Sequence, residues 1–241
     1  MIQHLLQLIW NQRKQNAWLW AELLLVSVFL WFLVDYLYVM GRTYTAPLGF
    51  DIRHTYSIVI SSLSERSPDY IPKEKRERPD GVHLLTALDR IRTYPGVESA
   101  CLTDGGMPYY MGSRNLVWRI DTLQVPCRYA FVTPEFFDVF RIYDKDGKTA
   151  SLKRAIEDNN SIVISADVET MNPGLSLLGQ KAYRGNVTDE IEETIRGISV
   201  PIRRHEYTKA EPNVYRALRL SRMEEGYYEG MIDAVRLCVR V

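Results

Sequence analysis

A long apolar segment near the N-terminus constrains this chain more than any other feature. The 24 residues of Ala17–Met40 contain only two charged side chains, Glu22 and Asp35. As a helix the segment would extend about 36 Å, enough to cross a hydrocarbon core of about 30 Å with some tilt. Tryptophans at its start and tyrosines at its end match the aromatic belts of membrane proteins. The segment therefore predicts a transmembrane helix over residues 17–40, with a buried core helix as the alternative.

The exit from this segment favours an uncleaved anchor over a signal peptide. The apolar stretch is longer than the core of a signal peptide and begins far from Met1. Met40–Ala46 offers no cleavage site with small residues at both required positions, because Tyr44 occupies one of them. We expect the helix to remain part of the protein.

The residues before the segment predict a second, amphipathic helix within residues 1–16, lying in the membrane interface or on its cytoplasmic side. Apolar side chains recur there at helical spacing: Ile2, Leu5, Leu6, Ile9 and Trp10. Extension of the transmembrane helix into water is the alternative. Basic residues on the two sides of the span are nearly balanced, so the charge pattern favours a cytoplasmic N-terminus only slightly.

Glu22 and Asp35 are acidic side chains within or beside the membrane. Intramembrane acids commonly contact partner helices or line a pathway. Each of these lies close enough to one end of the span to reach the interface, which is the simpler reading. Asp35 is the better candidate for contact with a partner.

Residues 41–241 have the composition of an ordinary folded domain. The whole chain has 30 basic and 30 acidic residues, so its formal net charge of zero argues against a nucleic-acid partner. Cys101, Cys127 and Cys238 are widely spaced. An oxidising compartment would permit a Cys101–Cys127 disulfide, and three buried free thiols are the simpler reading.

Alternating apolar patterns predict an α+β domain built from β–α–β units. His54–Ile60 is typical of a strand, Val82–Tyr94 of a helix, and Val97–Leu102 of the next strand. Between the first two, Ser61–Pro79 predicts a solvated loop that includes the charged run Lys73–Arg78. Further strands are expected at residues 115–120, 127–132, 161–165, 193–200, 214–220 and 234–241, and a short helix or turn at 171–179.

A short aromatic helix is predicted after Val132. Thr133 is expected to cap it, and Pro134 and Glu135 suit a first turn. The helix carries Phe136, Phe137, Val139 and Phe140, which should be buried and hold the sheet.

The chain carries no local motif of an enzyme active site. The four histidines, His4, His54, His83 and His205, show no metal-ligand spacing. Neither a nucleophile elbow nor a phosphate-binding loop is present. His205, Glu206 and Asp138 are interpreted as surface or structural residues. We expect no catalytic residue, no cofactor and no metal.

The order of these segments resembles the N-terminal part of MacB/FtsX-type ABC transporter permeases, particularly those of Bacteroidetes that lack their own ATPase. The resemblance rests on Ile9–Asn16 leading into Trp20–Leu23, Trp31–Asp35, Tyr94–Ser99, Val132–Phe140 and Ser161–Ser165. It implies a cytoplasmic N-terminus, a first transmembrane helix in the bacterial inner membrane, and a MacB-like periplasmic core domain of two subdomains with mixed sheets over residues 41–241.

The same resemblance implies the partners. They are a separate ABC ATPase subunit that drives the helices, a full-length permease or a second copy of this chain, and membrane lipid. Such permeases continue into three further transmembrane helices, which this sequence lacks after Val241. It is therefore expected to act as a permease component and not as a transporter alone, whether as a truncated permease, a split gene product or an accessory subunit. A single-pass ligand-binding or sensor subunit is the alternative function, and a membrane-tethered enzyme is the least favoured.

Overall fold

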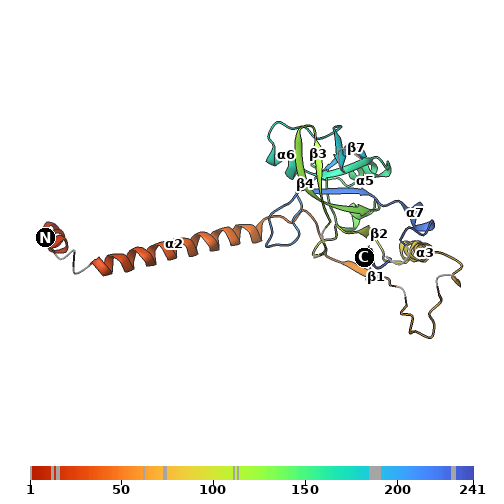
Figure 1. Ribbon diagram of the computed structural model, residues 1–241, viewed down its shortest axis with the longest axis horizontal. Coiled ribbons are helices and arrows are strands. Elements are labelled where there is room, and N and C mark those ends of the chain that lie inside the picture. Colours follow the sequence, from red (N-terminus) through yellow and green to blue (C-terminus); the bar gives the residue numbers. More distant parts are fainter. Residues whose placement is uncertain are drawn as a thin grey trace. The chain divides into compact units, whose positions relative to one another are not determined.

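The computed structural model describes residues 2–11, 14, 17–61, 63–72, 75–110, 112, 114–184, 191–228 and 232–241 (Figure 1). It divides into two compact units, Met1–Ala46 and Pro47–Val241. One is helical and the other is a mixed α+β domain, which confirms the predicted fold class.

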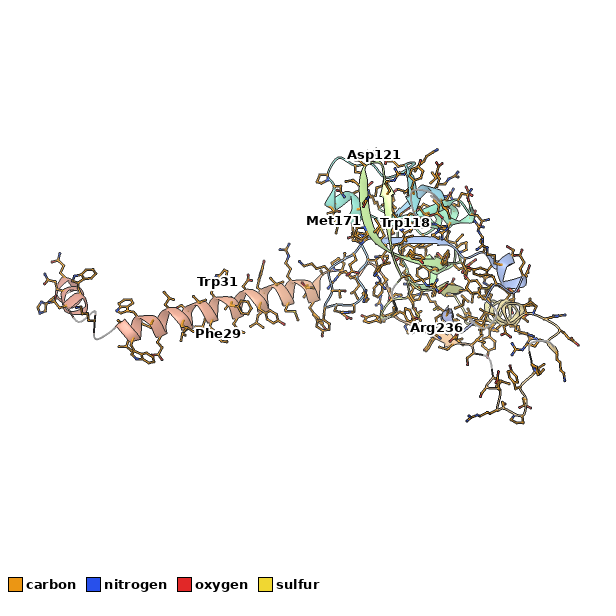
Figure 2. All side chains as sticks on the ribbon, viewed as in Figure 1. Phe29, Trp31, Trp118, Asp121, Met171 and Arg236 are labelled. Carbon is orange, nitrogen blue, oxygen red and sulfur yellow. The ribbon has the colours of Figure 1, made fainter. Side chains whose placement is uncertain are left out.

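The first unit contains helices α1, Ile2–Asn11, and α2, Ala17–Thr45. Helix α2 has 29 residues, about 43 Å, and continues five residues beyond the predicted end at Met40. None of its side chains is buried, and Phe29 and Trp31 project outward from it (Figure 2). By length and composition it can cross a membrane, with a mean hydropathy of 2.2 over its most apolar window. A helix so apolar and so exposed needs a non-aqueous environment, which argues against the buried-core alternative.

Helix α1 covers the predicted amphipathic segment. Its backbone is helical, but the side chains of Ile2, Leu5, Leu6 and Ile9 lie outside the described part of the chain, as do Lys73 and Glu74 of the charged run. The amphipathic character of α1 therefore stays a prediction.

The second unit is organised around a closed barrel. Its strands are β1 (Thr55–Val59), β2 (Ser99–Asp104), β3 (Asn115–Ile120), β4 (Leu123–Val132), β5 (Ser161–Ser165), β6 (Lys181–Arg184), β7 (Ile191–Ser199), β8 (Asn213–Ala217) and β9 (Val235–Arg240). They are ordered β1-β9-β2-β4-β3-β6-β7-β5-β8, and β8 also pairs in parallel with β4. This last pairing joins β4, β3, β6, β7, β5 and β8 into a ring.

Side chains from every strand of the ring fill the barrel. Trp118 of β3 is fully buried and lies within the barrel in Figure 2. Residues at alternate positions point to the same face of a strand, so each strand supplies every second side chain to the interior. The buried cluster consists of Trp118, Ile120, Val125, Cys127, Ile162, Ile164, Val168, Leu177, Ala182, Ile195 and Val214.

Strand β4 extends beyond its pairing with β3, and there Phe131 and Val132 pair with β2 on one edge while still pairing with β8 on the other. Strands β2, β9 and β1 continue the sheet from this point as a three-stranded extension. Helix α3, Asp80–Arg92, covers one face, where Leu84 and Leu88 pack on Leu102 and Leu237. The predicted β–α–β unit is present as β1, α3 and β2. Its two strands do not pair with each other, because the C-terminal strand β9 lies between them and runs antiparallel to both.

Helix α4, Phe136–Val139, covers the opposite face of this sheet. Its three phenylalanine rings, counting Phe140, and Val139 are buried, as predicted. The predicted cap was wrong. Thr133 does not cap the helix, because its hydroxyl accepts a hydrogen bond from the backbone N–H of Leu102 in β2 at 3.1 Å, and Glu135 occupies the N-cap position.

The remaining helical elements of the domain are α5 (Ala150–Glu157), α6 (Asp167–Met171), α7 (Leu220–Glu224) and a 3-10 turn, η2 (Ile232–Ala234). Helix α5 was not predicted, and it buries Leu152, Ala155 and Ile156. Strand β6 was also not predicted, although it completes the barrel between β3 and β7.

Candidate functional site

The segment that follows helix α2 is fixed to the domain by backbone hydrogen bonds. Leu48 O accepts from the N–H of Arg203 at 3.0 Å, and the Asp51 N–H donates to Phe140 O at 2.8 Å. His54 O accepts from the N–H of the last residue, Val241, at 3.0 Å. We call residues 47–54 the docked segment. Its bonds reach three separate parts of the domain.

Arg240 provides the strongest attachment of the docked segment. Its side chain is buried, with 2% of its surface exposed. Nη2 donates to Asp51 O at 2.7 Å, Nη1 to Arg53 O at 2.7 Å, and Nε to Val139 O of α4 at 2.8 Å. One guanidinium at the end of β9 therefore joins the docked segment to the helix that covers the sheet.

Gly49 allows the docked segment to approach the domain closely. Its φ of +83° is in the region that favours glycine, and a Cβ there would lie 2.1 Å from Pro201 O. Asp51 also forms contacts within the segment. Its carboxylate accepts hydrogen bonds from the Arg53 N–H at 2.8 Å and from Arg53 Nη2 at 2.9 Å. The Arg53 guanidinium lowers the pKa of the Asp51 carboxyl to about 2. The segment is thus bonded both to the rest of the domain and within itself.

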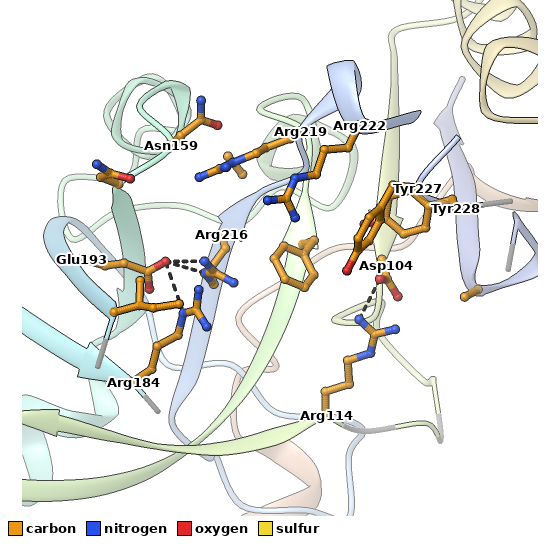
Figure 3. A pocket seen from close by; sticks show the side chains of 15 residues that line it. Asp104, Arg114, Asn159, Arg184, Glu193, Arg216, Arg219, Arg222, Tyr227 and Tyr228 are labelled. Carbon is orange, nitrogen blue, oxygen red and sulfur yellow. Dashed lines mark hydrogen bonds and ion pairs between the residues drawn. The ribbon is translucent and has the colours of Figure 1, made fainter. Parts of the chain in front are cut away.

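A second candidate site is a cleft of about 560 Å³ at one end of the barrel (Figure 3). We call it the cationic cleft. Its described lining contains no Ser, Cys, His or Lys side chain. It consists of Asp104, Arg114, Phe131, Asn159, Asn160, Arg184, Ile191, Glu193, Arg216, Ala217, Arg219, Arg222, Tyr227, Tyr228 and Ala234. Such a lining can hold an anion by charge and hydrogen bonds.

Three charged side chains form the floor of the cationic cleft, because alternate residues of each barrel strand point to the interior. Arg184, Glu193 and Arg216 each lie two residues from a side chain in the barrel core, namely Ala182, Ile195 and Val214. They therefore point to the interior face of their strands and close the end of the barrel. Figure 3 shows the two guanidiniums meeting the carboxylate.

Glu193 is the shared counterion of this floor. Its Oε1 accepts from Arg216 Nε at 2.7 Å and lies 3.6 Å from Arg184 Nε. The carboxylate is almost fully buried, and the Arg216 side chain is 12% exposed. Burial lowers the pKa of Arg216, and the charge of Glu193 opposes this effect. The Arg216 guanidinium also stacks on Phe131, with Cζ 4.9 Å from the ring centroid.

The walls of the cleft add three more arginines. Arg114 Nη1 pairs with Asp104 Oδ2 at 2.7 Å. Burial raises the pKa of the Asp104 carboxyl, and Arg114 partly offsets this. Arg219 and Arg222 reach in from the start and middle of α7 (Figure 3), and the Arg222 guanidinium lies 5.2 Å from the Tyr227 ring centroid. No carboxylate of the described residues lies in ion-pair range of either.

The three cysteines are free and buried. Cys127 lies in the barrel core, whereas Cys101 of β2 lies between strands β2-β9-β1 and helix α4, with Cys238 directly opposite it on β9. The predicted possibility of a Cys101–Cys127 disulfide was therefore wrong, because the two side chains belong to different cores. Burial raises the pKa of both thiols, that of Cys127 to about 12.

The other residues considered from the sequence remain apart. Asp138 accepts hydrogen bonds from Thr149 Oγ1 at 2.6 Å and Lys153 Nζ at 2.5 Å, which ties α4 to α5. His205 Nδ1 accepts from the N–H of Tyr207 within a turn. Within the described ranges, no three His, Cys, Asp or Glu side chains converge as metal ligands would.

Sequence reasoning did not predict the cationic cleft. Its residues come from seven separate stretches of chain, and only the closure of the barrel brings them together. One local signal was present: Arg216, Arg219 and Arg222 follow one another at three-residue steps.

No protein-family model matches the sequence, and no curated protein matches it. Among solved structures, the chain is similar to a domain assigned to a permease protein from Porphyromonas gingivalis, at 19% identity and a TM-score of 0.46. That alignment covers 65% of this chain and 60% of the solved one, so it spans less than two thirds of that structure.

Two further solved structures are similar. One is the periplasmic region of MacB from Actinobacillus actinomycetemcomitans, at 9% identity and a TM-score of 0.44; the alignment covers 83% of this chain and 79% of that one. The other is the extracellular domain of the noncanonical ABC-type transporter YknZ from Gram-positive bacteria, at 11% identity and a TM-score of 0.45; the alignment covers 78% of this chain and 83% of that one. At such identities and TM-scores they transfer no residue's role to this chain.

Proposed function

We propose that the chain is a non-catalytic component of an ABC-type permease in the inner membrane of a bacterium. Helix α2 spans the membrane once, the N-terminus lies in the cytoplasm, and the Pro47–Val241 domain lies in the periplasm. The observation that carries this proposal is the exposed apolar helix α2, followed directly in the chain by a segment bonded to a folded domain. The resemblance of the sequence motifs to MacB/FtsX-type permeases supports it.

In this role the docked segment is the coupling element. A separate ATPase subunit drives the membrane helices, together with a full-length permease or a second copy of this chain. A displacement of α2 pulls on residues 47–54, and Arg240 passes the force to β9 and α4 because it bonds both the segment and Val139. Hydrogen bonds from a buried charged group resist such a pull better than neutral surface contacts.

The cationic cleft favours a second candidate, a membrane-anchored ligand-binding subunit. A cavity of about 560 Å³ has the size of a small-molecule site, and its charges suit an anion. The two candidates are compatible, since a permease component can also bind a ligand.

The orientation is tested by labelling single introduced cysteines with a membrane-impermeant maleimide on spheroplasts with an unbroken inner membrane, hereafter called intact cells. The native cysteines form a low background, because each is at most 1% exposed. We expect Glu157→Cys, on the exposed face of α5, to be labelled on intact cells. Gln7→Cys, on α1, should be labelled only after lysis.

The reverse pattern, with Gln7→Cys labelled on intact cells and Glu157→Cys protected, would overturn the proposed topology. Labelling of both variants on intact cells would show that α2 does not separate them across a membrane.

A further inference from the structure

We infer that the cationic cleft binds a phosphate ester that carries hydroxyl groups, as glycerol phosphate and sugar phosphates do. This assigns a ligand class to the cleft and does not depend on the coupling role of the docked segment. Three features carry it: the excess of arginine, the position of two guanidiniums that have no ion-pair partner among the described residues, and a buried carboxylate oxygen that has no donor in the same part of the chain.

The net positive charge of the cleft favours an anionic ligand. Five arginines line it against two carboxylates, so three positive charges are uncompensated within the described lining. Like charges held close together in a partly desolvated cavity repel one another. A dianionic phosphate would leave one positive charge and a carboxylate would leave two, so phosphate neutralises the cleft better.

The geometry places the available donors opposite the floor of the cleft. Glu193 accepts a hydrogen bond from Arg216, and Asp104 accepts one from Arg114. Arg184 is only in ion-pair range of Glu193, since its Nε lies 3.6 Å away and has no hydrogen-bond partner among the described residues. Arg219 and Arg222 enter from the α7 side. In Figure 3 the Arg222 guanidinium lies between the two ion pairs, and Arg219 extends toward Asn159 above the Glu193–Arg216 pair. The planar fork of a guanidinium donates two parallel hydrogen bonds to phosphate oxygens, so these two arginines are suited to hold the phosphate.

The environment of Glu193 indicates that the ligand carries hydroxyl groups. Its Oε2 is buried and has no hydrogen-bond partner among the described residues, although the carboxylate is 98% buried and lines the cleft. An unpaired buried carboxylate oxygen is costly, and a hydroxyl is a donor that would satisfy it. Asn159 and Asn160, also in the lining, add exposed amides that can bond further hydroxyls.

The ligand can be a soluble phosphate monoester or a lipid headgroup, which is a phosphodiester with one negative charge. The charge balance of the cleft favours the soluble monoester. The size of the cleft suits a small molecule or a single headgroup rather than a long polymer. Both sources present a phosphate and, in phosphatidylglycerol, a glycerol hydroxyl.

The test measures binding of sn-glycerol 3-phosphate to the full chain in phosphatidylcholine nanodiscs by isothermal titration calorimetry. We expect saturable binding, weaker binding of inorganic phosphate, and none of glycerol. The double variant Arg219→Gln/Arg222→Gln should bind glycerol phosphate at least about tenfold more weakly, because it loses two charge-assisted contacts. Arg66→Gln/Arg90→Gln makes the same charge change at exposed sites outside the lining and should bind normally.

Absence of saturable glycerol phosphate binding, or equal affinity of the Arg219/Arg222 variant and the wild type, would overturn the proposal. Equal affinity for inorganic phosphate would overturn the role of the hydroxyl groups. If phosphatidylglycerol in the nanodisc abolishes binding of the soluble ester, the ligand is a lipid headgroup; unchanged binding supports a soluble ester.

Discussion

Replacing Arg240 with alanine is expected to lower the free energy of unfolding of the domain by about 3–5 kcal/mol, comparable to breaking a buried charged network. The change removes three hydrogen bonds and leaves the carbonyls of Asp51, Arg53 and Val139 without their donor. For a domain of this size the loss corresponds to a fall in Tm of about 10 °C, measured by circular dichroism on the full chain in detergent.

Arg53→Ala is the matched control. The Arg53 side chain is 82% exposed and, among the described residues, forms an ion pair with Asp51 alone, so its removal should destabilise the domain far less than Arg240→Ala does. The docked segment should also become a protease target in Arg240→Ala, with faster trypsin cleavage after Arg53 than in the wild type. A Tm within 2 °C of the control and unchanged cleavage would show that Arg240 does not hold the segment.

Glu193→Gln is expected to cost about 3 kcal/mol although the side chains have nearly the same shape. The change leaves the guanidiniums of Arg184 and Arg216 facing each other in a buried floor without their shared counterion. Breaking a buried ion pair by removing one partner is strongly destabilising, because the remaining charge is uncompensated. Thermal unfolding of the full chain in detergent measures the loss.

The neighbouring substitution Glu192→Gln serves as its control. Glu192 pairs with Lys181 at the surface, and both side chains are about half exposed, so the loss of stability should be much smaller than for Glu193→Gln. Added phosphate should recover more stability in Glu193→Gln than in Glu192→Gln, since the former carries the larger positive excess in the cleft. Equal stability of the two variants would contradict the role given to Glu193.

Strongly patterned elements were predictable from the sequence. The strand predicted at Asn115–Ile120 has the same bounds as β3, because its alternating apolar residues fit a strand with one buried face. The aromatic content of residues 136–140 likewise predicted a buried helix. Thr133 fits a cap by its sequence context, but a tertiary bond to Leu102 N–H competes for its hydroxyl.

The closure of the barrel could not be predicted from local pattern. It depends on the parallel pairing of β4 with β8, elements about 85 positions apart, and on β6, Lys181–Arg184, which is short and charged at both ends. The cationic cleft depends on the same closure. Arg184, Glu193 and Arg216 look like solvated charges along their strands until the ring brings them to one end of the barrel.

The most direct test of the account is co-purification from native membranes. The full chain, tagged at its C-terminus, is extracted in a mild detergent and its partners are quantified by mass spectrometry against a tagged single-pass protein of unrelated sequence. The account predicts enrichment of an ABC ATPase subunit together with a multi-spanning permease or an untagged second copy of this chain. Recovery of the tagged chain with neither an ATPase nor a membrane partner would contradict the proposed role.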